Sequence, residues 1–402
     1  MKGAFNGPGG GNGVPAYDIV LSAQTLENIL QYKSDIAGGS AKPGDRLKRA
    51  LDETGIPPDR MTAQDFIQAL LATKQPMIFA ESAIKCDGTD WTHRELGILG
   101  DINITMNAKF YDNGVWDPAN KDFREHKPPL EGQLMFTPGP LLGVGKAFSG
   151  VSPDYADVVS GKNIDQEKYD ALIERRLLPI FSHANDCAKA DGKKAVITLP
   201  GIGCGAFAGE FKGRMGAHLN EALKTMLEKH GENLSHIACV YFDPFAECGN
   251  QQKDIHSIQY RVRPATKNPG KPQLCAPAAY AEAGDDFTGC KLYKIVAWDH
   301  ASYPGNDFFG NSRMTDDGVS AAATNSMECV TGVRGSYMGG MYAPPRGYES
   351  WDDVVSDKGI RLVAKDNVKV VTNGAGYMTL VEYEKNAGAS PAPRIANKTG
   401  LK

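Results

Sequence analysis

Apolar runs and amphipathic helical segments alternate along the chain after about residue 91. Short runs rich in β-branched and aromatic residues predict strands at 96–105, 195–199, 237–242 and 292–298. The clearest helix is predicted over Met215–His230, where apolar residues recur at helical spacing: Leu219, Ala222, Leu223, Met226 and Leu227. This alternation predicts an α/β fold, a three-layer α/β/α sandwich with a mostly parallel sheet, in which ligands bind at the carboxyl ends of strands.

The pattern differs at both ends of the chain. Residues 1–17 are a glycine-rich leader, and 18–90 are predicted to form a small helical extension. One of its helices opens at Thr62, because Thr62-Ala-Gln-Asp65 resembles a capping box. The main domain is predicted over 91–385. It ends in a hairpin with strands at 368–372 and 377–383 around Asn373-Gly374, and a disordered tail follows over 386–402.

Composition narrows the class of protein. The 44 lysine and arginine residues nearly balance 48 aspartate and glutamate residues, so no basic stripe indicates a nucleic-acid partner. No apolar segment approaches the ~20 residues that span a bilayer, and the first residues lack the apolar core of a signal peptide. The eight cysteines form no C-x-x-C pair, which favours a reducing compartment. We therefore expect a soluble protein that binds neither nucleic acid nor membrane.

Residues 194–211, KAVITLPGIGCGAFAGEF, are the most informative segment. A predicted strand runs into a glycine-dense loop and then a helix, an order that lets backbone N–H groups approach an anion. No Lys-Ser or Lys-Thr follows the glycines and the spacing is not G-x-G-x-x-G, which argues against a triphosphate or dinucleotide fingerprint. A diphosphate fits better than a ligand-free turn. The residues expected to bind it are Gly201, Gly203, Cys204, Gly205, Ala206 and Phe207.

Two weaker signals accompany this loop. Asp101, with Ile102, follows a glycine in an otherwise apolar run, and its carboxylate could accept a hydrogen bond from an adenine amine or simply cap a turn. Gly139, Gly143 and Gly145 could form a second wall along the phosphates or a plain loop. Neither signal decides between its two interpretations.

Residues 297–326 crowd carboxylates into one polar segment, which carries Asp299, Asp307, Asp316 and Asp317. One interpretation is a solvated, turn-rich surface loop. The other is functional, since grouped carboxylates can hold a guanidinium, deprotonate a water molecule and stabilise an oxocarbenium-like transition state. Among the functional uses, a metal site ranks below binding a cation and activating water, because His300 beside Asp299 would point away from it on a strand and no other histidine lies nearby.

Together these motifs resemble the macrodomain, the fold that binds ADP-ribose. The GCGAF core is similar to the poly(ADP-ribose) glycohydrolase branch, and residues 293–326 are similar to the secreted bacterial effector macrodomains of the MavL family. The resemblance covers roughly residues 90–385. It implies that Asp299, Asp307 and Asp317 are the catalytic residues, whereas the glycine loop holds the diphosphate and Asp101 the adenine.

The resemblance also implies an activity. The paired glutamates that follow a Gly-Gly-Gly run in poly(ADP-ribose) glycohydrolases are absent, which favours a linkage other than ribose–ribose. The expected reaction is removal of ADP-ribose from a protein arginine, with ubiquitin as the carrier and the host cytosol as the place of action. A planar cation at the scissile bond suits a cluster of aspartates. No cofactor or metal ion is expected, only ADP-ribose as ligand and product.

Two other classes of protein remain as alternatives. A pure ADP-ribose reader would share the glycine loop but would not need three aspartates. A nucleotide-sugar or NAD-dependent enzyme would show a glycine fingerprint in its first βα turn and an acidic residue about 20 positions later, and neither is present. Turnover of a modified protein discriminates the hydrolase from the reader.

Overall fold

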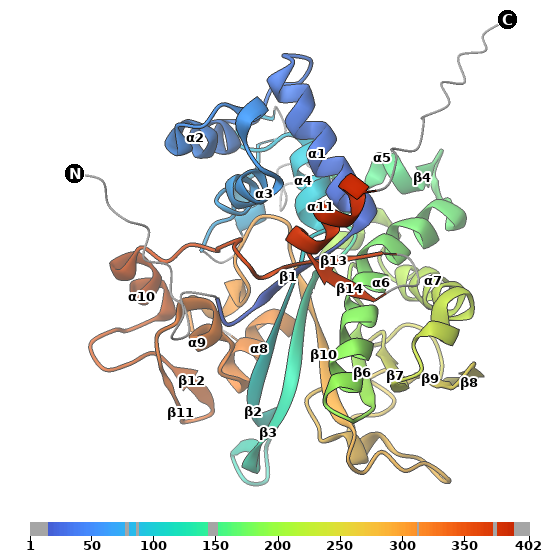
Figure 1. The fold of residues 1–402 in the computed structure, drawn as a ribbon. Coiled ribbons are helices and arrows are strands. Elements are labelled where there is room, and N and C mark those ends of the chain that lie inside the picture. Colours follow the sequence, from blue (N-terminus) through green and yellow to red (C-terminus); the bar gives the residue numbers. More distant parts are fainter. Residues whose placement is uncertain are drawn as a thin grey trace, which may run out of the picture.

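One mixed sheet forms the centre of the protein (Figure 1). The computed structural model describes residues 15–76, 80–85, 88–143, 152–311, 313–372 and 376–389. Within them, the strands of this sheet lie side by side in the order β14 (Tyr377–Thr379), β13 (Val368–Val371), β1 (Asp18–Ser22), β2 (Asn103–Asp117), β3 (Asp122–Pro138), β10 (Lys291–Trp298), β6 (Ala195–Pro200), β7 (Ile237–Asp243), β9 (Ile258–Val262) and β8 (Gln251–Ile255).

The centre of the sheet is parallel and much of its periphery is antiparallel. Strands β3, β10, β6, β7 and β9 run in the same direction, whereas β2 pairs antiparallel with β1 and β3, and β8 with β9. The register places Trp298 opposite Pro138 and Pro200 opposite Asp243. The carboxyl ends of β3, β10, β6 and β7 therefore meet at one edge, where the glycine loop and the aspartate segment both begin.

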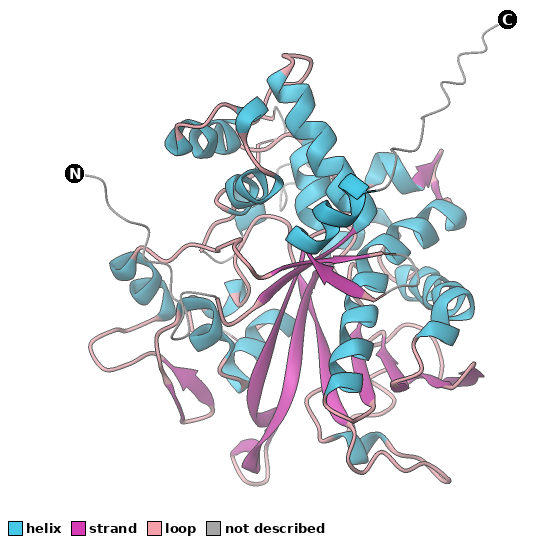
Figure 2. Cartoon of the chain, in the orientation of Figure 1, coloured by secondary structure: helices cyan, strands magenta, loops and turns pink. Residues whose placement is uncertain are grey.

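Helices cover both faces of the sheet, as Figure 2 shows. On one face, α6 (Gln166–Ala190) and α7 (Met215–His230) bury apolar side chains against β6, β7 and β10. The other face is covered by α1 (Ala23–Ala37), α3 (Ala63–Leu71), α4 (His93–Gly100), α8 (Asp316–Ala323), α9 (Ser326–Thr331) and α10 (Trp351–Lys358). The predicted three-layer α/β/α architecture is thus confirmed, with a sheet that is mixed rather than mostly parallel at its edges.

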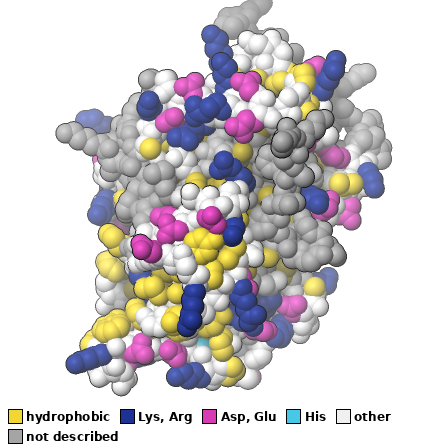
Figure 3. All heavy atoms as spheres, turned by 90° about the vertical axis from the view of Figure 1, so that its left-hand side faces the viewer, with side chains coloured by type: hydrophobic (Ala, Val, Ile, Leu, Met, Phe, Trp, Pro, Cys, Tyr) yellow, Lys and Arg dark blue, Asp and Glu magenta, His cyan; other side chains and the backbone are white. Residues whose placement is uncertain are grey.

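The remaining elements lie around this framework. They are α2 (Asp45–Thr54), α5 (Tyr155–Val158) and α11 (Leu380–Ala389), with two small ribbons, β4 (Val159–Ser160) with β5 (Asn163–Ile164) and β11 (Ser336–Met338) with β12 (Met341–Ala343). Figure 3 shows the face that carries α9, α10 and the β11–β12 hairpin. In its described part, basic and acidic side chains are interspersed and hydrophobic side chains gather over the lower half.

Local sequence signals predicted several elements correctly. The helix over Met215–His230 has the predicted bounds, and the Thr62 side chain accepts a hydrogen bond from the Asp65 N–H, which completes the predicted capping box. The predicted strand over 96–105 is wrong in its first half. Thr92 and Glu95 form another capping box, so α4 continues to Gly100 and the strand starts only at Asn103.

The C-terminal hairpin differs from its prediction in its second strand. β14 ends at Thr379, and α11 follows it directly. The Thr379 side chain accepts a hydrogen bond from the Glu382 N–H, a contact typical of a helix start. The predicted Asn373-Gly374 turn and most of the predicted tail lie outside the described residues, while α11 extends to Ala389.

Residues 18–90 pack into the same body as the rest of the chain. β1 lies inside the central sheet, where Ile19 pairs with Val368 on one side and with Ile104 on the other. Phe66 of α3 and Leu26 of α1 belong to the same apolar core as Trp298 of β10. Described residues from both sides of position 90 thus share one apolar core. Among the described residues, no helix is both long and apolar enough to span a bilayer.

Candidate functional site

The glycine loop follows β6 and packs backbone to backbone against a second glycine-containing segment. Gly203 has a φ of +72°, and a Cβ at this position would lie 2.7 Å from Cδ of Pro140. A Cβ on Gly139 would lie 2.5 Å from the Gly203 nitrogen, so both positions require glycine. The Leu142 N–H donates to the Phe207 carbonyl at 2.8 Å. The two segments thus lie together, although Gly145 is outside the described residues.

A cavity of about 870 Å³ opens beside this loop, at the carboxyl ends of β6 and β7. Gly201, Cys204 and Gly205 line one side, and Thr315 and Asp316 at the start of α8 line it as well. A Cβ on Gly205 would meet no heavy atom within 4 Å, and the Gly205 N–H has no acceptor among the described residues. An open backbone donor at a glycine loop is suited to an anionic ligand.

A chain of buried polar groups lies along the inner wall of this cavity. Lys294, in the middle of β10, donates to both carboxylate oxygens of Asp316 at 2.9 and 3.0 Å and to the Gln273 side chain at 2.7 Å. Gln273 donates in turn to Asp243 at 3.1 Å. Burial lowers the pKa of Lys294, while the Asp316 charge opposes the shift. This ion pair ties the start of α8 to the sheet.

Two large apolar side chains stand at the edge of the cavity. Phe245 is 69% exposed and has a φ of +58°, which is rare for a residue with a side chain. Asp243 holds this turn by accepting hydrogen bonds from the Phe245 and Ala265 N–H groups at 2.8 and 2.7 Å. Met314 is 77% exposed and also lines the cavity. An exposed aromatic ring in an uncommon backbone conformation beside a cavity is suited to contact with a planar ligand group.

The three predicted catalytic aspartates are buried, with at most 6% exposure each. Asp299 directly follows β10 and accepts hydrogen bonds from the Ala301 and Ser302 N–H groups, both at 2.7 Å. Asp317, in the first turn of α8, accepts from the Gly305 and Asn306 N–H groups at 2.8 and 3.0 Å. Asp299 and Asp317 are therefore not solvated surface groups, because both accept hydrogen bonds from the segment's own backbone.

Asp307 differs from the other two aspartates. It lies in the short helix Asn306–Phe308, and its Oδ1 atom is buried without a hydrogen-bond partner among the described residues. Burial and the Asp299 charge raise its pKa, while a hydrogen bond from Thr315 lowers it. Burial, with the charges of Asp307 and Asp299, holds the pKa of Asp317 well above its ordinary range. The three carboxylates thus interact electrostatically as one cluster.

Asp101 and Ile102 do not line the cavity. Asp101 is buried at the end of α4, and its two oxygens accept from the Nε atoms of Arg175 and Arg176 at 2.5 and 3.0 Å. Arg176 also donates to both oxygens of Asp154. Ile102 is part of the apolar core. Neither residue lines the cavity beside the glycine loop, and Asp101 instead balances two guanidinium groups.

This charge network ends next to the aspartate segment. His300 follows Asp299, and its Nε2 atom lies 3.6 Å from Oδ2 of Asp154. Although burial alone would raise the pKa of Asp154, Arg176 and His300 hold it below its ordinary range. The His300 ring also lies near Phe207 of the glycine loop, with 6.2 Å between ring centroids. His300 thus connects the buried ion pairs, the aspartate segment and the glycine loop.

Sequence reasoning missed the polar residues inside the cavity. Lys294 interrupts the apolar run LYKIVAW, which is a signal, since a lysine in a central strand needs a buried partner. Asp316 is one of the crowded carboxylates but was not assigned a role. Nothing local to the sequence indicates that Phe245 adopts a positive φ or that Gln273 bridges Asp243 and Lys294.

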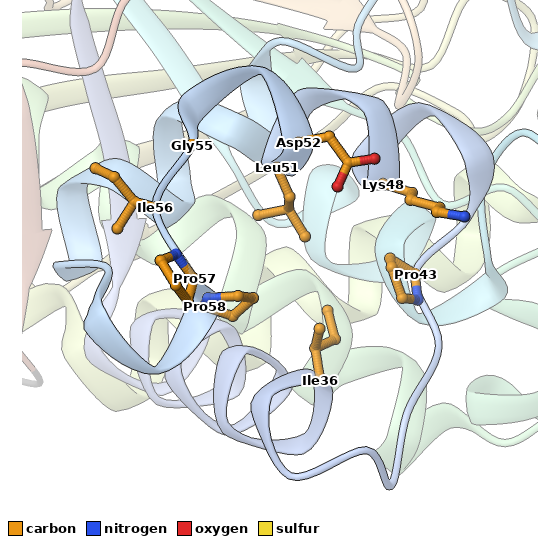
Figure 4. Close-up of a pocket in the computed structure, with 9 residues that line it drawn as sticks. All are labelled: Ile36, Pro43, Lys48, Leu51, Asp52, Gly55, Ile56, Pro57 and Pro58. Carbon is orange, nitrogen blue, oxygen red and sulfur yellow. The ribbon is translucent and has the colours of Figure 1, made fainter.

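Other candidate sites are less informative. Within the described part of the chain, no group of three or more His, Cys, Asp or Glu side chains is arranged to hold a metal ion. A smaller cavity of about 350 Å³ lies between α1 and α2 (Figure 4). None of the predicted site residues lines it, and its lining is mostly apolar: Ile36, Pro43, Lys48, Leu51, Asp52, Gly55, Ile56, Pro57 and Pro58.

Comparison with known proteins identifies the family. No curated protein matches the chain. The family model described as macrodomain effector MavL matches residues 17–348, which is most of the chain and includes β1, the glycine loop and the whole aspartate segment. The chain therefore belongs to the family of macrodomain effectors represented by MavL.

Proposed function

We propose that this protein is a hydrolase that removes ADP-ribose from an arginine side chain of a protein, with ubiquitin as the expected carrier. The observation that supports it most is a cluster of three buried carboxylates, Asp299, Asp307 and Asp317. They do not line the cavity themselves, but the segment that carries them leads into Thr315 and Asp316, which line it together with the glycine loop. Membership in a family of macrodomain effectors agrees with ADP-ribose as the ligand and with action inside a host cell.

The ligand is expected to lie with its diphosphate beside the glycine loop. Gly205 lines the cavity and its N–H has no acceptor among the described residues, and Thr315 and Asp316 at the start of α8 line the same cavity. In this pose adenine is assigned to the cavity edge, where Phe245 offers a ring face, and not to Asp101, whose oxygens already accept from two arginines. The distal ribose then points toward the aspartate cluster.

The cluster supplies the chemistry. A guanidinium attached to the distal ribose carries positive charge, which a group of carboxylates attracts. As the bond between ribose carbon and arginine nitrogen breaks, positive charge develops on the ribose, and the same carboxylates stabilise it. The water oxygen bonds to the ribose carbon, and the electron pair of the broken bond goes to the guanidine nitrogen.

Asp307 is assigned the proton transfer. Its Oδ1 atom is without a partner among the described residues. By contrast, both oxygens of Asp317 accept from backbone N–H groups, and those of Asp299 accept from backbone N–H groups and from the Ser302 hydroxyl. Asp307 removes a proton from the attacking water and passes it to the departing guanidine nitrogen. Asp299 and Asp317 hold the segment in place by accepting backbone hydrogen bonds. The products are unmodified arginine and free ADP-ribose.

A pH dependence follows from this assignment. Asp307 must be ionised to accept a proton, and its pKa is raised from the ordinary aspartate value by burial and by Asp299. We therefore expect kcat/KM to fall as the pH decreases through a value above the ordinary ~3.9, and to be restored as the pH increases again. Steady-state kinetics between about pH 3 and 8, with circular dichroism to verify folding, measure this. If kcat/KM fell only at or below the ordinary aspartate pKa, Asp307 would not be the group that accepts the proton.

An ADP-ribose reader without catalysis is the second candidate function. The backbone hydrogen bonds of Asp299 and Asp317 favour it, because both carboxylates have a structural use in the absence of any reaction. Incubation with arginine-ADP-ribosylated ubiquitin, followed by mass spectrometry, tests the hydrolase against the reader. If the protein only binds ADP-ribose, the ubiquitin stays ADP-ribosylated.

A further inference from the structure

Lys74 reaches from the N-terminal helices to the backbone of the aspartate segment. It lies just after α3, and its Nζ atom donates to the His300 carbonyl at 2.7 Å and to the Asp299 carbonyl at 3.2 Å. The same ammonium group lies 4.0 Å from the ring centroid of Trp298, the last residue of β10. Lys74 is only 2% exposed. Its positive charge is thus buried directly beneath the start of the segment.

The neighbouring residue extends this contact. The Gln75 N–H donates to the Ala301 carbonyl at 2.7 Å, and the Tyr303 N–H donates to the Gln75 carbonyl at 2.9 Å. Gln75 and Ser302 thereby form a parallel β-bridge. Residues 74 and 75 together hold the backbone of 299–303 along its length.

These contacts complement those of the Asp299 side chain. Asp299 accepts from the Ala301 and Ser302 N–H groups and from the Ser302 hydroxyl. The donors of the turn are therefore bound by its own carboxylate. Lys74 supplies donors for the carbonyls of the same turn. Burying an ammonium group costs free energy unless it is well hydrogen-bonded, and an apolar side chain here would leave the Asp299 and His300 carbonyls without this donor. Lys74 therefore fixes the backbone conformation of this turn.

We propose that Lys74 is a positioning residue for the hydrolytic reaction, through which the N-terminal helices fix the backbone that carries Asp299. This inference rests on the proposed hydrolase function, and it gives residues 18–90 a role in the site. Lys74 acts through Asp299 and its turn. It is therefore expected to influence the rate of the chemical step more than the binding of adenine and diphosphate, which involve the glycine loop.

The test compares Lys74→Met with Lys33→Met. Lys33 of α1 is a matched control, because its Nζ atom also donates to two backbone carbonyls, those of Met61 and Pro58 at 3.0 and 3.4 Å, within the N-terminal helices. We expect Lys74→Met to lower kcat by about 10- to 100-fold, the scale of an ångström-level misplacement, with KM and ADP-ribose affinity within about twofold. Lys74→Arg, which keeps the charge and the donors, should recover part of the rate.

Hydrogen exchange gives a readout that is independent of hydrolysis. In Lys74→Met the amides of Ala301, Ser302, Tyr303, Gly305 and Asn306 should exchange faster than in the protein without a substitution, whereas Lys33→Met should leave them unchanged. If Lys74→Met does not fold, Lys74→Arg is measured instead and should show a smaller change of the same kind. Unchanged exchange, or a kcat equal to that of Lys33→Met, overturns the proposal. If the protein without any substitution hydrolyses no substrate, the proposed function is refuted. The hydrogen-exchange comparison still tests whether Lys74 fixes the backbone of the aspartate segment.

Discussion

Replacement of Gly205 by valine is expected to abolish ADP-ribose binding in a protein that still folds. A side chain at this position meets no heavy atom of the protein within 4 Å, and it projects where the cavity is open. Its φ of −85° lies outside the left-handed region, so the requirement for glycine here comes from ligand space and not from a positive φ. The branched side chain would project into this open space and occupy the volume assigned to the diphosphate.

Calorimetry with ADP-ribose and AMP measures this effect. The unmodified protein should bind ADP-ribose much more tightly than AMP, which lacks the second phosphate and the distal ribose. Gly203→Ala is the matched comparison, because Gly203 has a φ of +72° and a Cβ there would lie 2.7 Å from Cδ of Pro140. It should lose thermal stability, whereas Gly205→Val should lose binding. A folded Gly205→Val protein with undiminished affinity would show that the loop holds no ligand.

Asp307→Asn is expected to lower the rate of hydrolysis by at least about 10²-fold, the scale on which positioned acid–base groups act. The amide has nearly the same shape but cannot take a proton, and Asp307 makes no backbone hydrogen bond that the substitution would remove among the described residues. ADP-ribose affinity should persist, since the glycine loop is unchanged. Single-turnover kinetics with a separate binding measurement distinguish the two effects.

The other two aspartates provide a less direct test. Asp317→Ala would leave the Gly305 and Asn306 N–H groups without their acceptor, at about 1–3 kcal/mol for each buried group. Loss of activity in that variant therefore mixes catalysis with stability. Asp366→Asn, at an exposed carboxylate away from the cavity, is a suitable control for Asp307→Asn. Equal rates in Asp307→Asn, Asp366→Asn and the unmodified protein would exclude Asp307 from the reaction.

Sequence patterns were informative wherever the determining contacts are local. A β-branched run before glycines predicts β6 and its loop, and Thr62 with Asp65 predicts the start of α3. Local contacts also explain an error, because the Thr92–Glu95 capping box starts a helix in a run that reads as a strand. Secondary structure near such a run depends on which of two local signals is stronger.

The site depends on contacts that no local pattern contains. Asp101 meets Arg176, which is far away in the chain, and this pairing explains why its carboxylate does not face the cavity. The polar segment after β10 was open to a surface interpretation because its carboxylates resemble turn residues, yet Asp299 and Asp317 fold onto its own N–H groups. Lys74 contacts Asp299 and His300 only through tertiary packing.

Mass spectrometry of arginine-ADP-ribosylated ubiquitin, incubated with the protein and a chelator, tests the central claim most directly. The account predicts loss of the whole ADP-ribosyl group, recovery of unmodified arginine and appearance of free ADP-ribose, with no need for a divalent metal ion. Two results would contradict it. Ubiquitin that stays modified would leave a reader of ADP-ribose, and loss of AMP with phosphoribose retained on the arginine would indicate cleavage of the diphosphate at the glycine loop instead.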